Sequence, residues 1–96
     1  MAKERLKQRG KKRRVLFSLE ASTANKVSLG GDFNNWDTQA HLMRKDANGV
    51  WKKTLMLPPA RYEYKFLVDG RWWNDPKNDQ TCPNCFGTLN NVLIVS

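Results

Sequence analysis

The chain has 96 residues, of which 40% are hydrophobic and 27% charged, including four Trp, four Phe and two Tyr. This length suits one domain, and the composition is too apolar and aromatic for a disordered chain. No apolar run approaches the roughly 20 residues that a membrane-spanning helix needs. These numbers exclude a multi-domain enzyme, a membrane span and a coiled coil, and they favour one small soluble domain.

The net charge of +8 is concentrated at the start of the chain. Residues 1–14 contain eight Lys or Arg and one Glu, whereas residues 15–96 contain nine basic and eight acidic side chains. A block of like charge with almost no apolar residues cannot bury enough surface to fold. We therefore predict a disordered basic tail over residues 1–14 and a folded domain over residues 15–96.

Apolar and polar residues alternate along most of this domain, which is the period of a β-strand. Taken in chain order, the alternation predicts strands over residues 15–20, 27–29, 42–45, 50–57, 62–68, 71–73 and 91–95. Asn48-Gly49 and Asp69-Gly70 predict tight turns, because these residues tolerate positive φ. Residues 74–88 are rich in Pro, Gly, Asn and Asp, and they are predicted to form a loop.

About seven short antiparallel strands with no helix predict an all-β fold. The expected architecture is an immunoglobulin-like β-sandwich, and a five-stranded oligonucleotide-binding barrel is the alternative. Within residues 62–68, Tyr62, Tyr64, Phe66 and Val68 share one face and are predicted to fill the core. Lys65 lies on the opposite face and is free to leave the core.

Side chains suited to catalysis or metal binding are few. His41 is the single histidine, and the sequence contains no nucleophilic Ser or Cys in an elbow motif that it could activate. We therefore assign it no role. Asp32 and Asp37 could face each other as a glycosidase pair must, but a small sandwich has little depth to seclude them. Cys82 and Cys85 have the spacing of half a zinc site, so a metal would have to be shared between two copies. We predict a protein that is not an enzyme and that needs no cofactor.

Several tryptophans lie in polar, turn-rich contexts where a core residue is not expected. Trp36 follows Asn34-Asn35, and Trp72 and Trp73 are adjacent on one predicted strand. Neighbouring strand residues point to opposite faces, so one of the latter two must leave the core. An exposed indole combines a broad apolar face with a polar N–H, which suits a sugar ring or a nucleobase.

Three motifs in this order carry a family resemblance: GGDFNNWD, then NGVWKKTLMLPPARYEYKFLVDGRWWNDP, then FGTLNNVLIV. They resemble the glycogen-binding domain of the AMP-activated protein kinase beta subunit. They also resemble the N-terminal modules of isoamylases and branching enzymes, which form carbohydrate-binding module family forty-eight. The resemblance covers about residues 15–95. It implies an immunoglobulin-like sandwich that binds α-1,4-linked glucans such as glycogen, starch or maltooligosaccharides without cleaving them.

Carried over position by position, the resemblance implies six sugar-contacting residues, namely Trp36, Lys65, Trp72, Phe86, Thr88 and Asn90. In the family's pattern, the two tryptophans stack on sugar rings, and the lysine, threonine and asparagine hydrogen-bond to hydroxyl groups. The phenylalanine stands where an apolar residue packs against the glucan. Trp73 is then the expected core residue, and we expect a shallow surface site rather than a pocket.

The main alternative is a nucleic-acid or acidic-partner binder that uses the basic tail together with the aromatic patch. A glycogen-metabolising enzyme or a kinase is the protein partner that the resemblance implies. The apolar run at residues 15–19 is too short for the core of a secretory signal, and two cysteines are too few for a disulfide framework. We therefore expect a cytoplasmic protein with no membrane partner.

Overall fold

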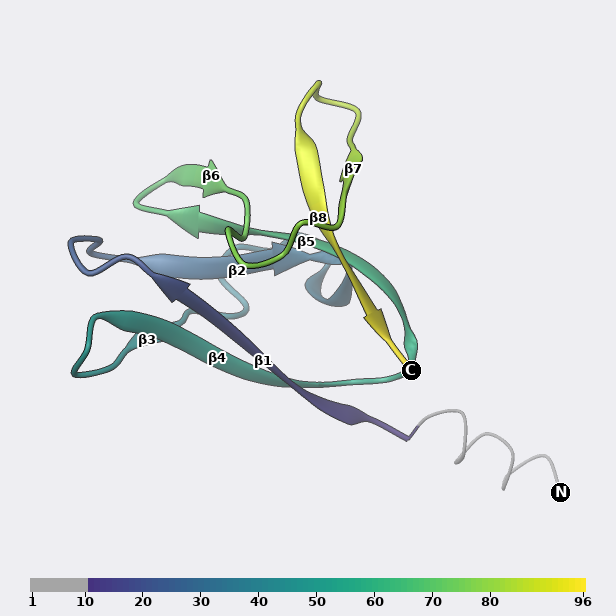
Figure 1. Ribbon diagram of the computed structural model, residues 1–96, viewed down its shortest axis with the longest axis horizontal. Coiled ribbons are helices and arrows are strands. Elements are labelled where there is room, and N and C mark those ends of the chain that lie inside the picture. The colour runs from purple at the N-terminus through teal and green to yellow at the C-terminus, as the bar shows by residue number, and fades with distance from the viewer. Residues whose placement is uncertain (1–10) are drawn as a thin grey trace, which may run out of the picture.

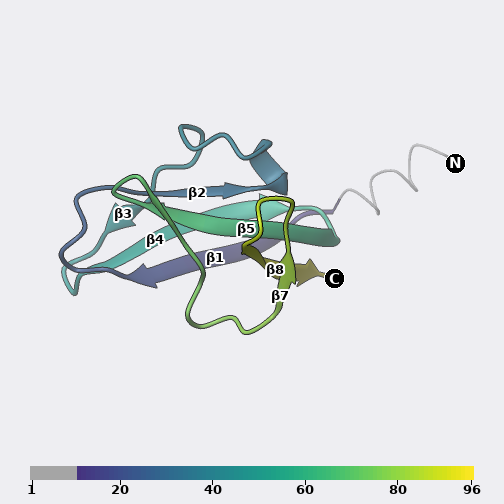
Figure 2. The ribbon, with the colours of Figure 1, turned by 90° about the horizontal axis from the view of Figure 1, so that it is seen from above.

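The computed structural model describes residues 11–96 and shows two antiparallel sheets packed as a sandwich (Figures 1 and 2). One sheet has the strand order β1–β4–β3; the other has the order β2–β5–β8–β7, with β6 added to β5. The strands are β1 (Arg13–Glu20), β2 (Val27–Gly31), β3 (Arg44–Lys45), β4 (Val50–Leu57), β5 (Ala60–Val68), β6 (Arg71–Trp73), β7 (Thr81–Pro83) and β8 (Leu89–Val95). The predicted all-β, immunoglobulin-like sandwich is confirmed, with eight strands among residues 11–96 in place of about seven.

Helical structure is limited, within the described part of the chain, to the 3-10 turn η1 (Asp32–Asn34). It follows β2 directly and lies between the strands predicted over residues 27–29 and 42–45. No helix in residues 11–96 has the length and apolar character needed to cross a membrane.

The core lies between the two sheets and follows the alternation expected for strands. Its large members are Phe17, Leu19, Val27, Leu29, Met43, Trp51, Leu55, Leu57, Tyr62, Tyr64, Phe66 and Val68. The four β5 residues predicted to share a core-facing side are all buried. Trp51 is the tryptophan that fills the core, where its Nε1 donates a hydrogen bond to the Ala21 carbonyl oxygen at 2.9 Å.

The prediction that Trp73 is a core residue is wrong, because 42% of this residue is exposed. It lies on β6 directly opposite Phe66 of β5, so it points to the core side of its own sheet. However, β6 pairs with β5 alone, and Figure 1 shows it well away from the β1–β4–β3 sheet. The opposite sheet therefore does not cover Trp73.

The domain begins earlier than predicted. Strand β1 includes Arg13 and Arg14, which we assigned to the basic tail, and pairs them with Leu57 and Met56 of β4. The Arg13 Nε also donates to the main-chain oxygen of Ser96 at 3.0 Å. The predicted disorder of residues 1–10 lies outside the described residues.

Part of the predicted loop at residues 74–88 forms a strand. Residues of β7 pair with β8, and Pro83 opposes Leu89 at the end of the ladder. Proline is tolerated there because β7 lies at the edge of its sheet and needs no donor on its outer side. The resulting β7–β8 hairpin rises from the body of the sandwich (Figure 1).

The rest of this segment is fastened to β8 by the fully buried side chain of Asn91. Its Oδ1 accepts hydrogen bonds from the Asp75 main-chain N–H at 2.6 Å and from Asn74 Nδ2 at 3.2 Å. Its Nδ2 donates to the Asn78 carbonyl oxygen at 2.9 Å. One amide therefore holds the connection between β6 and β7 against the sheet.

We predict that Asn91→Ala lowers the free energy of unfolding by roughly 2–4 kcal/mol, because it leaves buried donors and acceptors unpaired. Chemical denaturation measures this change. Asn25, whose side chain is exposed and takes no part in such a network, offers the matched control. Asn25→Ala should stay within about 0.5 kcal/mol of wild type, and an equal loss in both variants would show that Asn91 has no special role.

Candidate functional site

A groove of about 720 Å³ lies on the face of β5 that points away from the core. Its lining residues come from the loop that follows η1, from β5, from β6 and from the β7–β8 hairpin; they are Trp36, Glu63, Lys65, Trp72, Asn84, Cys85, Phe86, Thr88 and Asn90. The structure therefore brings together all six residues predicted from the sequence. The site is a groove rather than the shallow surface that we expected, because the hairpin forms a wall beside the sheet.

Two indole rings lie over Gly30 of β2 and line the groove. The ring centroids of Trp36 and Trp72 are 5.9 Å apart and the planes meet at 71°, an edge-to-face contact. A Cβ at Gly30 would lie 3.0 Å from Cη2 of Trp72 and 3.4 Å from Cε3 of Trp36. The absence of a side chain at this position is what lets both rings lie on the sheet.

Trp36 is held in place by the turn that carries it. Asn35 and Trp36 both have left-handed backbone conformations, with φ of 55° and 60°, which are uncommon outside glycine. The Trp36 main-chain N–H donates to the Gly31 carbonyl oxygen at 2.9 Å, and its Nε1 donates to Asp32 Oδ1 at 3.1 Å. The second oxygen of Asp32 accepts the Glu63 main-chain N–H at 2.8 Å. Asp32 thus ties the indole to β5, a structural role in place of the catalytic one weighed above.

Lys65 lies opposite Gly30 across the β2–β5 ladder, on the predicted non-core face. It is nevertheless only 7% exposed. Its Nζ donates to Thr88 Oγ1 at 3.4 Å, so it spans from β5 to the hairpin. The ammonium group therefore belongs to the lining of the groove and not to the open surface.

The tip of the β7–β8 hairpin is organised by Asn84. Its Oδ1 accepts the main-chain N–H groups of Phe86 at 2.9 Å and Thr88 at 3.1 Å. Its Nδ2 donates to Thr88 Oγ1 at 2.7 Å and to Asn90 Oδ1 at 2.9 Å. These bonds hold Phe86 in an exposed position, with 85% of the residue accessible, beside the polar groups of the groove.

A carboxylate completes this network. Glu63 Oε1 accepts a hydrogen bond from Asn90 Nδ2 at 3.0 Å, and Oε2 forms an ion pair with Arg61 at 2.8 Å. These hydrogen bonds, with a smaller one from Cys82, lower the pKa of Glu63 to about 2. The groove therefore carries an ionised carboxylate at neutral pH, two residues from the Lys65 ammonium on the same strand face.

Sequence reasoning missed three lining residues, Glu63, Asn84 and Cys85. Strand alternation could have found Glu63, because it shares a face with Lys65. Asn84 and Cys85 lie at the tip of a hairpin that was predicted as a loop; no pattern pointed to Asn84, and the spacing of Cys85 from Cys82 suggested half a zinc site and not this groove. Cys82 and Cys85 are both free thiols, and residues 11–96 contain no group of three or more His, Cys, Asp or Glu side chains that could hold a metal ion.

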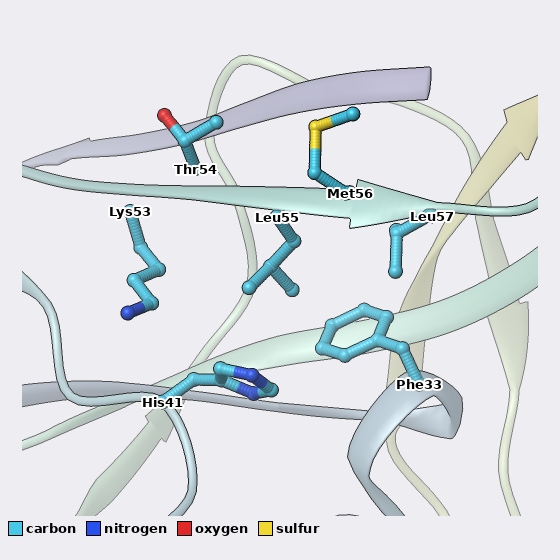
Figure 3. A pocket seen from close by; sticks show the side chains of 7 residues that line it. All are labelled: Phe33, His41, Lys53, Thr54, Leu55, Met56 and Leu57. Atoms are coloured by element: carbon cyan, nitrogen blue, oxygen red, sulfur yellow. The ribbon is translucent and has the colours of Figure 1, made fainter. Parts of the chain in front are cut away.

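A second cavity, of about 290 Å³, lies between β4 and the η1 turn and contains none of the predicted site residues. Figure 3 shows Leu55 and Leu57 pointing toward Phe33 and His41, while alternate residues of β4 point away. Asn34 Nδ2 donates to His41 Nδ1 at 2.9 Å. Burial, and then the charge of Lys53, lower the pKa of His41. This histidine is partly buried and hydrogen-bonded within the fold rather than freely solvated.

The groove combines apolar faces with a polar rim. Two indoles and a phenyl ring offer flat apolar surfaces, while an ammonium, a hydroxyl, two amides and a carboxylate offer donors and acceptors. A pyranose ring has the complementary surfaces, because its C–H groups form an apolar patch and its hydroxyls project around it. This arrangement defines a carbohydrate-binding surface.

Comparison with known sequences places this surface in a family. The sequence profile described as "Glycogen recognition site of AMP-activated protein kinase" matches residues 4–96. The chain therefore belongs to the glycogen-recognition family of AMP-activated protein kinase.

Relatives include plant proteins and kinase subunits. Protein PTST homolog 2, chloroplastic, from Arabidopsis thaliana is 43% identical over 75 residues, covering 78% of this chain and 14% of that protein. Protein FLOURY ENDOSPERM 6, chloroplastic, from Oryza sativa subsp. japonica is 37% identical over 83 residues, which cover 86% of this chain and 15% of that protein. The 5'-AMP-activated protein kinase subunit beta-1 of Sus scrofa is 42% identical over 69 residues, which cover 72% of this chain and 53% of that protein. The chain thus spans about one seventh of the plant relatives and about half of the pig subunit.

We predict that Gly30→Val displaces the Trp36 and Trp72 rings, because the added carbons occupy the space where both rings lie. Near-ultraviolet circular dichroism should show the loss of the signal from the edge-to-face pair, while far-ultraviolet circular dichroism keeps the strand spectrum. The Trp36→Phe variant removes one indole of the pair, so its near-ultraviolet spectrum shows which part of the signal comes from the Trp36–Trp72 contact. An unchanged near-ultraviolet spectrum in Gly30→Val would mean that the rings do not depend on this glycine.

We also predict a pH dependence that originates from Glu63. Its folded-state pKa of about 2 lies below the usual 4.5, so the ionised form stabilises the fold above about pH 4.5. This contribution is lost as the pH falls toward 2. Glu63→Gln should make the free energy of unfolding less dependent on pH in that window, as measured by urea titrations. Glu20→Gln removes one charge from the other sheet and serves as control; equal slopes in the Glu63→Gln variant and wild type would contradict the assignment.

Proposed function

We propose that this domain binds α-1,4-linked glucans in the groove and does not cleave them. The observation that carries the proposal is the meeting of six predicted residues from four separate segments in one groove, with Trp36 and Trp72 side by side over Gly30. The indole faces would stack on successive glucose units, and the Lys65, Thr88 and Asn90 groups would bond to their hydroxyls. Membership of the glycogen-recognition family supports the same ligand class.

A binding role without catalysis agrees with the chemistry of the groove. Its single carboxylate, Glu63, is held ionised by Asn90 and Arg61, and glycoside hydrolysis needs a second carboxyl group at a set distance. His41 lies in the other cavity, bonded to Asn34. We infer a module that recognises a glucan for another activity to act on.

Such a site would bind single oligosaccharides weakly, with dissociation constants of roughly micromolar to millimolar, because each stacking contact adds only about 1 kcal/mol beyond area burial. Attachment to a polymer would then depend on several contacts at once. A partner enzyme or kinase is part of the proposal, since relatives are named as kinase subunits. The prediction of a cytoplasmic protein stays a prediction, and two plant relatives are named as chloroplastic. The likeness to isoamylase modules also stays a prediction.

Titration with maltoheptaose tests the proposal. Trp36→Ala and Trp72→Ala should each weaken binding at least about tenfold, because truncating a central aromatic anchor costs about 2 kcal/mol or more. Isothermal titration calorimetry measures the affinity, and far-ultraviolet circular dichroism checks the fold. Leu16→Ala and Met56→Ala, which remove exposed apolar side chains from the other sheet, are the controls and should bind as wild type. Full affinity in both tryptophan variants would rule out the groove as the glucan site.

A further inference from the structure

Strand β6 presents a tryptophan on each of its faces. Trp72 lies opposite Leu67 and shares the groove side with Lys65, whereas Trp73 lies opposite Phe66 on the other side. Both are accessible, at 46% and 42%. The groove uses only the first, so an exposed indole of similar accessibility stands outside the proposed site.

The polar edge of Trp73 has no partner within the described residues. The indole N–H groups of Trp36 and Trp51 are hydrogen-bonded, to Asp32 and to the Ala21 carbonyl oxygen. Among residues 11–96, Trp73 makes no such bond, and its ring contacts no other aromatic ring at stacking distance. Its N–H therefore has no hydrogen-bond partner within the described residues, and the 42% exposure of the residue leaves part of the indole open to a ligand from outside the protein.

Arg71 supplies hydrogen-bond donors beside this ring. It is exposed and lies two residues from Trp73, so the side chains share a face about 7 Å apart along the strand. The ion pairs that the structure shows between described residues join Lys52 to Asp46 and Arg61 to Glu63, and neither includes Arg71. A guanidinium carries five N–H donors in a fixed plane, which suits the hydroxyls at the rim of a sugar ring.

The strand that carries this pair is anchored at both ends. Before it, the Asp69-Gly70 turn has φ of 48° and 84°, and the Asp69 carboxylate accepts the main-chain N–H groups of Asn25 and Lys26. After it, Asn74 Nδ2 donates to the Leu89 carbonyl oxygen at 2.9 Å. The indole and the guanidinium thus stand on a fixed support, which reduces the entropy lost when a ligand binds.

We propose that Trp73 and Arg71 form a second α-glucan site, on the opposite face of β6 from the groove, and that it takes a second glucan chain. The ligand class rests on the proposed function of the groove. A short oligosaccharide stacked on Trp72 cannot also cover a ring on the other face of the strand, so the two sites bind separate chains. Strand β6 then lies between two chains of a glucan polymer, and the domain binds the polymer bivalently.

Indole N–H signals in ¹H–¹⁵N correlation spectra test this directly with maltoheptaose as the probe. Assigned through Trp→Phe variants, the Trp36 and Trp72 signals should follow one binding curve and the Trp73 signal a second one. The buried Trp51 signal should stay in place as an internal control. In the Trp36→Ala/Trp72→Ala variant, the Trp73 curve should persist. An unmoved Trp73 signal when Trp36 and Trp72 are saturated overturns the second site and leaves the groove standing, whereas movement of Trp73 alone would overturn the groove and keep the second site.

Retention on immobilised amylose tests bivalency. Trp73→Leu, which keeps apolar contacts and removes the stacking face, and Arg71→Ala should each reduce retention by at least about tenfold. Calorimetric affinity of the groove for maltoheptaose should remain within about twofold of wild type. Ile94→Ala, at an exposed apolar position on β8, is the matched control and should be retained as wild type. Unchanged retention of both variants, with thermal unfolding confirming the fold, would refute the second site.

Discussion

The alternation of side chains along β5 is the constraint on which both the core and the groove depend. In one direction it places Tyr62, Tyr64, Phe66 and Val68 against the opposite sheet, and in the other it places Glu63 and Lys65 on the floor of the groove. The same strand pairs with β2, β6 and β8, which bring in Gly30, Trp72 and Asn90. A slip of one residue would turn the aromatic core outward and the charges inward. Burial of the core therefore fixes the register that assembles the site.

The groove has the features of a pre-organised site. The single side chain of Asn84 bonds to Phe86, Thr88 and Asn90. Asp32 links the Trp36 indole to the backbone of β5. These contacts hold the aromatic faces and polar groups before any ligand arrives, so less conformational entropy is lost on binding. The left-handed conformations of Asn35 and Trp36 fit this interpretation, because an uncommon backbone geometry persists only where surrounding contacts impose it.

Much of this arrangement could be predicted from the sequence, because strands repeat every two residues. Alternation alone placed Tyr64 and Phe66 on one face and Lys65 on the other, and the family resemblance placed Trp36, Trp72 and the residues of the last motif in one site. What the alternation does not encode is which parts of a sheet are covered. Trp73 points to the core side yet is exposed, because β6 lies beyond the reach of the second sheet. Lys65 points away from the core yet is buried, because the hairpin rises beside it.

Pairing within the β7–β8 hairpin explains the strand that was missed. The three residues of β7 have little strand character of their own, and they are extended because they pair with β8.

The central claim is that Trp36 and Trp72 form the surface on which a glucan lies. Intermolecular nuclear Overhauser effects in the maltoheptaose complex test it most directly. The account predicts contacts from glucose C–H protons to both indole rings and to Phe86; contacts confined to other parts of the domain would contradict it.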